Sequence, residues 1–600
     1  MLKKACLIIA ITFNCSSVFS QTTLLPIGSE DQYLLDRLET RSGRLCDSLV
    51  TGDKPESRRN AVNFLEYIKT RNNISKSIGQ IKKETDSVKN SKNSLSKIDE
   101  YNLRQMISEN GEWAAKNEET IFSKHTWFKT FYLTPYDFIH VKTEDFLLDK
   151  DFFLVINPVI SVIASEQHNN PQPTGISNTL ITNSHGAEIR GWISHKLGFY
   201  TSLTDNQEKF PYPVYSLAAN HGRQAVPGAD YFMNTSKNYY DYFQASGYIN
   251  FDAIKNHLNI TFGSGKHFIG DGMSSMFLTD YSSNMPFLQV QTRIWHINYE
   301  CLYLELTPQY DKTQGDGLLY HKFSTIHYLT WNAAKWLNLG FFEAEVFDRP
   351  NVYEISYLNP IIFSTAVNRF NGEGDKSILG MSGKIIAAKH VQLYGQLMFN
   401  EFRASELFGN KNWYGNKWGI QAGGKYFDVF NIKNLDIQAE LDAVRPYTYS
   451  AKDTLANYTN YNQPLADPLG AGFVKAIGVL KYQPVKNVYF TVKGTYYIQG
   501  VDTGGLNSGN NVFNPYRTAD HIYGVTMING PKAHCEIINV NLSYQLCRNV
   551  FIDLGGTYRK YVTTINNGMT STGPVAGPLT TDYVYFGLRI NAVRRDYDFF

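Results

Sequence analysis

The stretch Asp582-Tyr-Val-Tyr-Phe-Gly-Leu-Arg-Ile-Asn-Ala592 alternates apolar and polar side chains without a break. On an extended strand, successive side chains point to opposite faces. One face therefore carries Val584, Phe586, Leu588, Ile590 and Ala592, and the other carries Tyr583, Tyr585, Gly587, Arg589 and Asn591. A transmembrane barrel needs such a strand near its C-terminus to close. A half-solvated sheet of a soluble protein shows the same alternation, so the other strands decide between the two.

The same period of two recurs from Asp151 onward, in residues 288–295, 435–443, 488–493 and 538–545. In residues 435–443 the apolar positions, Leu441 among them, alternate with Asp436, Glu440 and Asp442. Three carboxylates on one strand face need water. A barrel provides it, because that face can point into a wet lumen while the opposite face meets lipid.

The connections between these strands are asymmetric. Tight links are expected at 194–196, 254–257, 296–298, 332–336, 388–390, 429–434, 484–487 and 546–549. Long links rich in Gly, Asn, Thr and Pro are expected at 205–240, 447–471, 502–531 and 561–581. Short periplasmic turns alternating with long outer loops are typical of outer-membrane barrels. A secreted multi-sandwich protein, the soluble alternative, would show turn signals every 8–12 residues on both sides.

These links define about eight hairpins. An opening strand at 152–165 and a closing strand at 583–592 bring the expected total to about eighteen, an even number as bacterial barrels require. The sequence therefore predicts an all-β protein: an antiparallel transmembrane β-barrel of the outer membrane over residues 126–600. No segment has the roughly 20 apolar residues of a membrane helix.

The N-terminus has the features of an export signal over residues 1–20. Lys3 and Lys4 form the positive region, residues 6–13 the apolar region, and residues 16–20 the cleavage region, so the mature chain is expected to start at Gln21. Cys15 offers a lipoprotein alternative, which the preceding residues 12–14 fit poorly.

Residues 21–125 have a helical rather than a strand pattern and are expected to form a small periplasmic helical region. A capping box is expected at Ser29-Glu-Asp-Gln32. Apolar stripes follow at residues 61–68 and 103–107. The Lys-, Ser- and Asn-rich residues 71–97 between them fit solvated helix or a flexible spacer.

Composition supports the barrel and limits the partners. The 40 Tyr, 37 Phe and 8 Trp suit two interfacial girdles, and the net charge of +2 predicts no nucleic-acid partner. After processing, Cys46, Cys301, Cys535 and Cys547 remain, without a CxxC pair, which indicates neither a zinc site nor a redox motif. A Cys535–Cys547 disulfide and two unpaired thiols are both open, and the thiols are slightly favoured.

The sequence contains no recognisable motif for enzyme chemistry. The glycine-rich segment 262–272 fails as a phosphate loop, because Ile260 occupies the first Gly position and His267 replaces the Ser or Thr. A kinked strand end or a loop at the barrel mouth is expected there instead, in which Lys266, His267 and Asp271 are candidates to meet a ligand. The sequence contains neither GxSxG nor HExxH, and its histidines are scattered. We expect no catalytic residue, cofactor or metal.

Asp436, Glu440 and Asp442 could form a catalytic pair in principle, but as neighbours on one strand face they fit a lumen lining better. A second candidate ligand site is the aromatic cluster Trp413, Tyr414 and Trp418. Aromatic rings stack on sugars, and the many Asn and Asp residues of the loops can bond their hydroxyl groups. The alternative is that these rings belong to the outer aromatic girdle.

Two segments resemble a known family. Residues 262–280 (FGSGKHFIGDGMSSMFLTD), followed by the strand with Trp295, look like a region of the Wzi-like capsule-assembly family, and closer still like the RemB-type gliding-motility proteins of Bacteroidetes. The run LNPIIF at 358–363, then Gly374-Asp375 and residues 378–380, is similar to a second block. The opening, Leu25-Pro26 and residues 29–38, also looks like Bacteroidetes envelope proteins.

The resemblance implies an eighteen-stranded barrel with periplasmic helices and a role in attaching or organising capsule or exopolysaccharide. The implied partners are surface polysaccharide together with outer-membrane lipid and lipopolysaccharide. One alternative is a motility or adhesion accessory protein whose helices dock periplasmic machinery, and another is a diffusion channel. The resemblance transfers no ligand residue.

Overall fold

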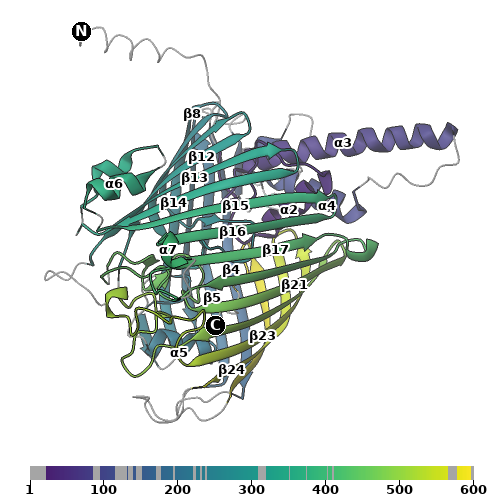
Figure 1. Cartoon of the computed structure of the whole chain (residues 1–600). Coiled ribbons are helices and arrows are strands. Elements are labelled where there is room, and N and C mark those ends of the chain that lie inside the picture. Colours follow the sequence, from purple (N-terminus) through teal and green to yellow (C-terminus); the bar gives the residue numbers. More distant parts are fainter. Residues whose placement is uncertain are drawn as a thin grey trace, which may run out of the picture.

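The protein is described from a computed structural model (Figure 1). It describes residues 22–85, 95–114, 131–132, 139–142, 152–169, 177–193, 196–220, 225–229, 233–236, 239–308, 319–349, 352–361, 363–372, 374–401, 403–407, 411–453, 455–564 and 578–595. The predicted export signal and the predicted boundary at 125/126 lie outside these residues. The division of the chain at that boundary therefore stays a prediction.

The chain forms a closed antiparallel barrel of 18 strands, which confirms the predicted fold class and strand number. The strands are β4 Phe152–His168, β5 Thr179–Ile193, β6 Leu197–Glu208, β8 Tyr239–Ile254, β9 Leu258–Gly265, β11 Met285–Ile294, β12 Ile297–Leu306, β13 Lys322–Ala334, β14 Leu337–Phe347, β15 Lys376–Ala388, β16 Val391–Glu401, β17 Lys417–Tyr426, β18 Leu435–Val444, β21 Phe473–Val485, β22 Val488–Gly500, β23 Lys532–Cys547, β24 Val550–Thr563 and β25 Leu579–Ile590. The last strand pairs with the first, from Asp582 opposite His168 to Ile590 opposite Ile160, and closes the barrel.

Strand polarity follows the sequence prediction. On β18, Leu441 is 62% exposed on the outer face, whereas its neighbour Glu440 is 2% exposed on the inner face. On the closing strand β25, Val584 and Phe586 are exposed and Arg589 is buried. On these two strands the apolar residues therefore face outward and the polar residues face the interior.

The connections alternate in length as predicted. All eight predicted tight links fall between paired strands, for example between β8 and β9, β17 and β18, and β23 and β24. Several of these turns contain an asparagine with positive φ, such as Asn256, Asn434 and Asn549, a conformation that Asn tolerates better than most residues. The four predicted long links also connect neighbouring strands. The prediction missed further long links, between β9 and β11 and between β14 and β15.

The connections between the barrel strands and the N-terminal region contain further short strands and helices. The remaining strands are β1 Asp53–Lys54, β2 Phe131–Tyr132, β3 Ile139–Lys142, β7 Met233–Ser236, β10 Phe268–Ile269, β19 Thr459–Asn460 and β20 Gln463–Pro464. The helices of the connections are α5 Tyr212–Asn220, η3 Ile355–Leu358, α6 Ser364–Phe370, α7 Ala404–Leu407, η4 Val429–Asn431 and η5 Tyr516–Thr518.

The N-terminal helices cap the end of the barrel where the short turns lie (Figure 1). They are α2 Glu30–Ser42, α3 Arg58–Thr85, α4 Lys97–Glu109 and η1 Gly111–Trp113. The predicted apolar stripes form their common core, which includes Leu35, Leu65 and Met106. Within the described residues, no helix is long and apolar enough to cross a membrane.

The capping boxes differ from the prediction. Ser29 precedes α2, but its side chain caps no backbone N–H. The Gln32 side chain, the other half of the expected box, accepts from the N–H of Gly28 and donates to Glu56. A reciprocal box forms between Ser96 and Asp99 at the start of α4. The Lys-, Ser- and Asn-rich residues 71–97 therefore include the end of α3 and this N-cap of α4.

The four cysteines named above are free. Cys535 is buried near one end of β23 and Cys547 is exposed at its other end. Twelve positions along one strand separate them by roughly 40 Å, at about 3.3 Å per residue. The disulfide alternative was therefore wrong, and the two thiols stay unpaired because the residues share a strand rather than face each other across a hairpin.

Candidate functional site

The lumen of the barrel is filled from both ends. The connection between β9 and β11 turns into the interior, where β10 pairs with β1 of the N-terminal region, Ile269 opposite Asp53 and Phe268 opposite Lys54. The N–H of Gly270 donates to the carbonyl of Gly52 at 2.8 Å. We call residues 266–284 the plug loop. A two-stranded sheet inside the barrel thus joins the plug loop to the helical cap.

Glu440 shows how the plug loop is held. Its carboxylate accepts hydrogen bonds from the N–H groups of Met273 (2.8 Å) and Ser274 (2.9 Å) and from the hydroxyl of Tyr394 (2.8 Å). A Cβ on Gly272 would lie 2.4 Å from this carboxylate. The glycine is needed for the close approach, and Glu440 faces protein donors rather than the expected wet lumen.

Apolar residues fix the far side of the plug loop. Phe277 stacks on Phe342 of β14 with ring centroids 4.4 Å apart, and the hydroxyl of Tyr449 donates to the carbonyl of Met276. Leu465 comes from the outer connection between β18 and β21 and lies in the same buried cluster. The plug loop is therefore clamped between the barrel wall and an outer connection.

Buried ion pairs attach the cap to the barrel. The Arg37 guanidinium contacts Asp99 of the cap, Asp428 in the β17–β18 turn (2.6 Å) and Asp436 of β18. Burial alone would raise the pKa of Asp428, but the charge and hydrogen bond of Arg37, the N–H of Asn434 and the Arg41 charge together lower it. A buried cation shared by three carboxylates holds α2 against the barrel end.

The sequence-predicted residues of the plug loop have internal partners. Asp271 pairs with Lys384 of β15 at 2.7 Å, and Lys384 also reaches Glu39 of the cap at 3.2 Å. Lys266 donates to the carbonyls of Gly228 (2.6 Å) and Asp280 (3.0 Å). These two charges therefore help to hold the plug loop in place.

His267 is 1% exposed and packs edge-on against Phe287. Burial lowers the pKa of its imidazole to about 4, so the ring is neutral. Its ring nitrogens have no hydrogen-bond partner among the described residues. The structure thus places Lys266, His267 and Asp271 in one loop but not around one point.

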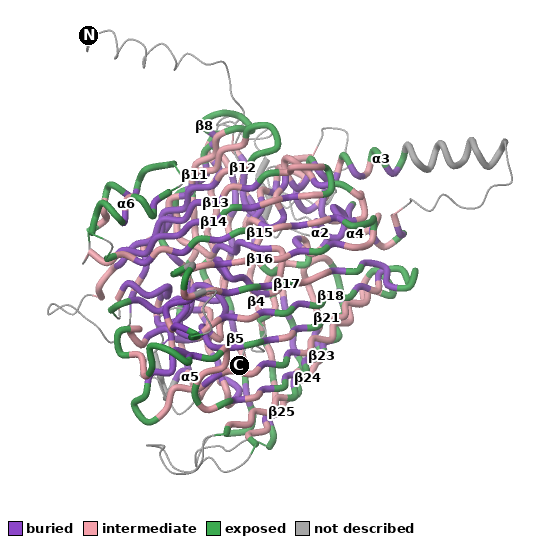
Figure 2. Tube along the Cα trace, in the orientation of Figure 1, coloured by how far each residue is buried: buried purple, intermediate pink, exposed green. Residues whose placement is uncertain are grey.

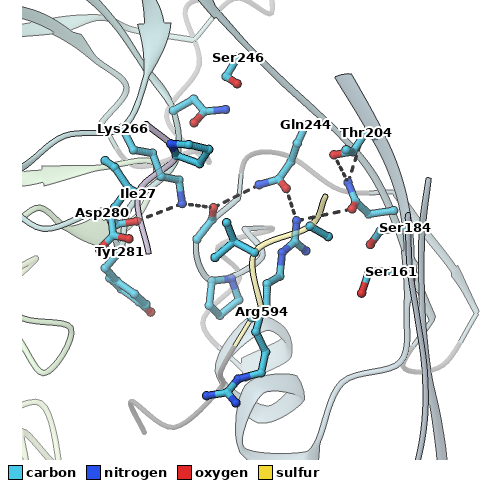
Figure 3. Close-up of a pocket in the computed structure, with 18 of the residues that line it drawn as sticks. Ile27, Ser161, Ser184, Thr204, Gln244, Ser246, Lys266, Asp280, Tyr281 and Arg594 are labelled. Atoms are coloured by element: carbon cyan, nitrogen blue, oxygen red, sulfur yellow. Dashed lines mark hydrogen bonds between the residues drawn. The ribbon is translucent and has the colours of Figure 1, made fainter. Parts of the chain in front are cut away.

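A cavity of about 530 Å³ remains between the plug loop and the wall (Figure 3). Hydroxyl groups of β4, β5 and β6 line it, including Ser161, Ser184 and Thr204. The C-terminal tail after β25 crosses this space, and Arg595 contacts Glu208 (2.9 Å) and Gln244 near the outer end of β6 and β8. The lining combines these polar side chains with apolar ones such as Ile27 and Val593.

The outer connections pack together into one layer. The backbone of residues 411–414 pairs with residues 522–525, through the N–H of Tyr414 to Ile522 (2.9 Å) and that of Gly524 to Lys411 (2.9 Å). Within residues 501–531, the Asp502 carboxylate accepts hydrogen bonds from Ser508, Asn510, Asn511 and Asn514. These contacts give the loops a defined surface.

The structure divides the predicted aromatic cluster. Trp413 is buried under Arg403, whose guanidinium carbon lies 4.6 Å from the ring centroid. Tyr414 packs on Trp413, and also on Tyr447 and Tyr516 inside the layer. Trp418 lies on the outer face of β17 in phase with exposed Ile420. It therefore fits the girdle interpretation rather than a common site with the other two.

Sequence reasoning missed the residues that this layer exposes. Ile522 and Tyr523 are exposed, and the Lys411 ammonium lies 5.8 Å from the centroid of the Tyr523 ring. His521 is exposed beside them. We call these four residues the outer platform. The abundance of Asn and Gly in 502–531 was a signal for a binding loop, but it did not indicate which ring stays exposed.

The residues that the structure describes contain no group of three or more His, Cys, Asp or Glu side chains suited to a metal ion. No family model matches the chain, and no curated protein matches it.

Solved structures show the fold. Wzi of Escherichia coli, described as an outer membrane protein involved in group 1 capsule assembly and a carbohydrate-binding β-barrel, is similar with a TM-score of 0.53 and 11% identity, over 96% of this chain and 100% of that chain. OprD of Pseudomonas aeruginosa has a TM-score of 0.39 and 9% identity over 73% of this chain and 94% of its own. OccAB2 of Acinetobacter baumannii has a TM-score of 0.39 and 8% identity over 73% of this chain and 97% of its own. The Wzi-like fold is confirmed, and the closer resemblance to gliding-motility proteins stays a prediction.

Proposed function

We propose that this chain is a non-enzymatic outer-membrane barrel that holds capsule or exopolysaccharide at the cell surface through its outer loops. The observation that carries the proposal is the contrast between the two routes a ligand could take. The lumen is filled by the plug loop and the cap, whereas the outer loop layer is ordered and presents the outer platform.

The chemistry of the outer platform suits a sugar. An exposed tyrosine offers a ring face for stacking and a hydroxyl for hydrogen bonding. Lys411 and His521 beside it can donate to hydroxyl or carboxylate oxygens of an acidic polysaccharide. The similarity in fold to Wzi, a carbohydrate-binding β-barrel, supports the same class of ligand.

The filled lumen counts against a diffusion channel. Buried ion pairs and a two-stranded sheet cross the interior. Lipid and lipopolysaccharide are then the surroundings of the outer strand faces, and polysaccharide is the ligand.

The test combines cells with purified protein. Deleting the gene should lower cell-bound polysaccharide, and unchanged retention would overturn the proposal. In a binding assay with the extracted polysaccharide, Tyr523→Ala should weaken binding by about tenfold, the loss of roughly 1–1.5 kcal/mol of ring contact. Tyr544→Ala is the matched control, since Tyr544 is equally exposed, at 48%, but lies on the outer face of β23.

A second role, as a motility accessory, is favoured by one observation. Helix α3 extends beyond the barrel end and away from the other cap helices (Figure 1). A projecting helix is suited to dock periplasmic machinery. Truncating its distal turns should then abolish surface spreading while polysaccharide retention stays normal, and normal spreading would remove this role.

A further inference from the structure

Two carboxylates on β14 point outward from the barrel. Phe342, Ala344 and Val346 pack into the lumenal cluster, so the alternate residues Glu343 and Glu345 lie on the outer face. His327 of β13 is directly opposite Glu343 in the strand register, at 3.7 Å. Carboxylates facing lipid would destabilise a transmembrane barrel, yet Glu343 is only 1% exposed.

The connection between β14 and β15 covers these carboxylates. The Glu343 carboxylate accepts hydrogen bonds from the N–H groups of Phe363 (2.6 Å) and Thr365 (2.9 Å) at the start of α6. The amide of Asn368, one turn later, donates to Glu345 at 3.3 Å. The underside of this connection is therefore polar and matched to the barrel wall.

Further contacts fix the connection flat on the outer wall of β12 and β13. Tyr303 donates to the carbonyl of Leu358 at 3.2 Å, and Thr325 donates to that of Tyr357 at 3.2 Å. At its base, Arg349 binds Asp375 through both terminal nitrogens, at 2.6 and 3.0 Å. Figure 1 shows α6 beside the strands, outside the barrel.

The opposite side of the connection carries exposed apolar side chains. Figure 2 colours much of the segment around α6 as exposed. The exposed apolar side chains are Val352 (61%), Ile355 (77%), Leu358 (42%), Ile361 (65%), Phe363 (71%) and Phe370 (90%). A contiguous apolar patch on a folded protein marks an interaction surface. We call the described residues of 352–371 the lateral segment.

The neighbouring strand indicates what covers the lateral segment. Leu379 lies opposite Glu343 in the β14–β15 register, and both Leu379 and Met381 are exposed on the outer face of β15. The apolar surface of the lateral segment is thus continuous with the outer face of the barrel, which meets lipid in the function proposed above. Because the backbone of the lateral segment is irregular, the segment cannot lie in the hydrocarbon core of the membrane. Helices with one apolar face do lie at the membrane interface.

We propose that the lateral segment is an in-plane lipid anchor, whose apolar side chains rest among the acyl chains at the outer leaflet of the outer membrane. The anchor would fix the rotation and depth of the barrel on one side. The inference rests on the proposed location of the barrel in the outer membrane.

Spin labels in the full chain, reconstituted in lipopolysaccharide-containing vesicles, test this proposal. In a background with the four mature cysteines replaced by serine, labels are attached after Phe370→Cys, Leu441→Cys or Leu506→Cys. Leu441 is the strand control, and Leu506, 61% exposed between β22 and β23, is the water control. The ratio of oxygen to nickel-chelate accessibility should be several-fold higher at Phe370 than at Leu506.

Two results would overturn the anchor: a nickel-accessible label at Phe370, which means water, or a label shielded from both reagents, which means a protein partner. If Leu441 is also nickel-accessible, the proposed membrane location fails together with the anchor. A second measurement guards against misfolding. Phe370→Asp should lower the yield of folded protein in vesicles, and Phe370→Leu should restore it; equal yields of the two variants would contradict the proposal.

Discussion

At the scale of the residue, the orientation of each strand side chain decides its environment. Leu441 projects outward and Glu440 inward, although they are neighbours. Leu441→Arg should cost about 2–4 kcal/mol in bilayers, because a cation near the midplane of the lipid face is expensive. Leu441→Met, which keeps the apolar surface, is the control. Urea unfolding in phospholipid vesicles measures both, and a cost below about 1 kcal/mol for the arginine would contradict the membrane orientation.

Glu56 gives the cap a pH dependence. Burial raises the pKa of Glu56 to about 7 from an ordinary value of 4.5. Because the folded pKa is the higher one, its contribution to stability is complete below about pH 4.5 and is lost as pH rises through 7. Glu56→Gln mimics the protonated form, so it should stabilise the cap relative to wild type at pH 8, by at most roughly 3 kcal/mol, and much less at pH 4.5.

Hydrogen exchange of the α2 amides measures this difference, since α2 packs against Glu56 through Gln32. The same difference between wild type and variant at both pH values would show that Glu56 does not titrate in this range.

At the scale of the element, single residues attach whole segments. Arg37 joins α2 to α4 through Asp99, to the β17–β18 turn through Asp428 and to β18 through Asp436. Arg37→Met should leave these carboxylates buried without a cation, at a cost of about 3–5 kcal/mol, and release the cap. Limited proteolysis should then cleave α2 while the barrel stays folded. Arg44→Met is the control, because Arg44 is exposed, and a cap that resists protease in both variants would refute the attachment.

At the scale of the whole molecule, the barrel is closed laterally by β25 pairing with β4 and along its axis by the plug loop. Wild-type protein should therefore give no stepwise conductance in planar bilayers. Replacing residues 267–283 with a short Gly-Ser linker should produce conductance, because it removes the sheet, the Glu440 bonds and the Asp271 ion pair together. Conductance of the wild type would show that the plug loop does not close the lumen.

The sequence by itself determined the barrel wall: its strand number, its hairpins and the face on which Leu441 and Glu440 lie. Those features follow from a period of two and from turn residues such as Asn434, which are local and act within a few positions. The filling of the barrel was decided only by the tertiary structure. Glu440 meets Met273 across 167 positions of the chain, and Arg37 meets Asp436 across 399.

The candidate site divides in the same way. The glycine-rich loop and the aromatic-rich loops could be found from composition. Composition did not show that Lys266 and Asp271 have partners inside the protein, or that Trp413 is buried and Trp418 faces outward. The lateral segment could not be predicted either, because Glu343 and Glu345 break the apolar pattern of an outer strand face. The connection folded over them supplies their hydrogen bonds and keeps them from lipid. Contacts between distant residues leave no periodic pattern in the sequence. A polar group can be buried only where the fold brings it a partner, so its burial could not be predicted from local sequence.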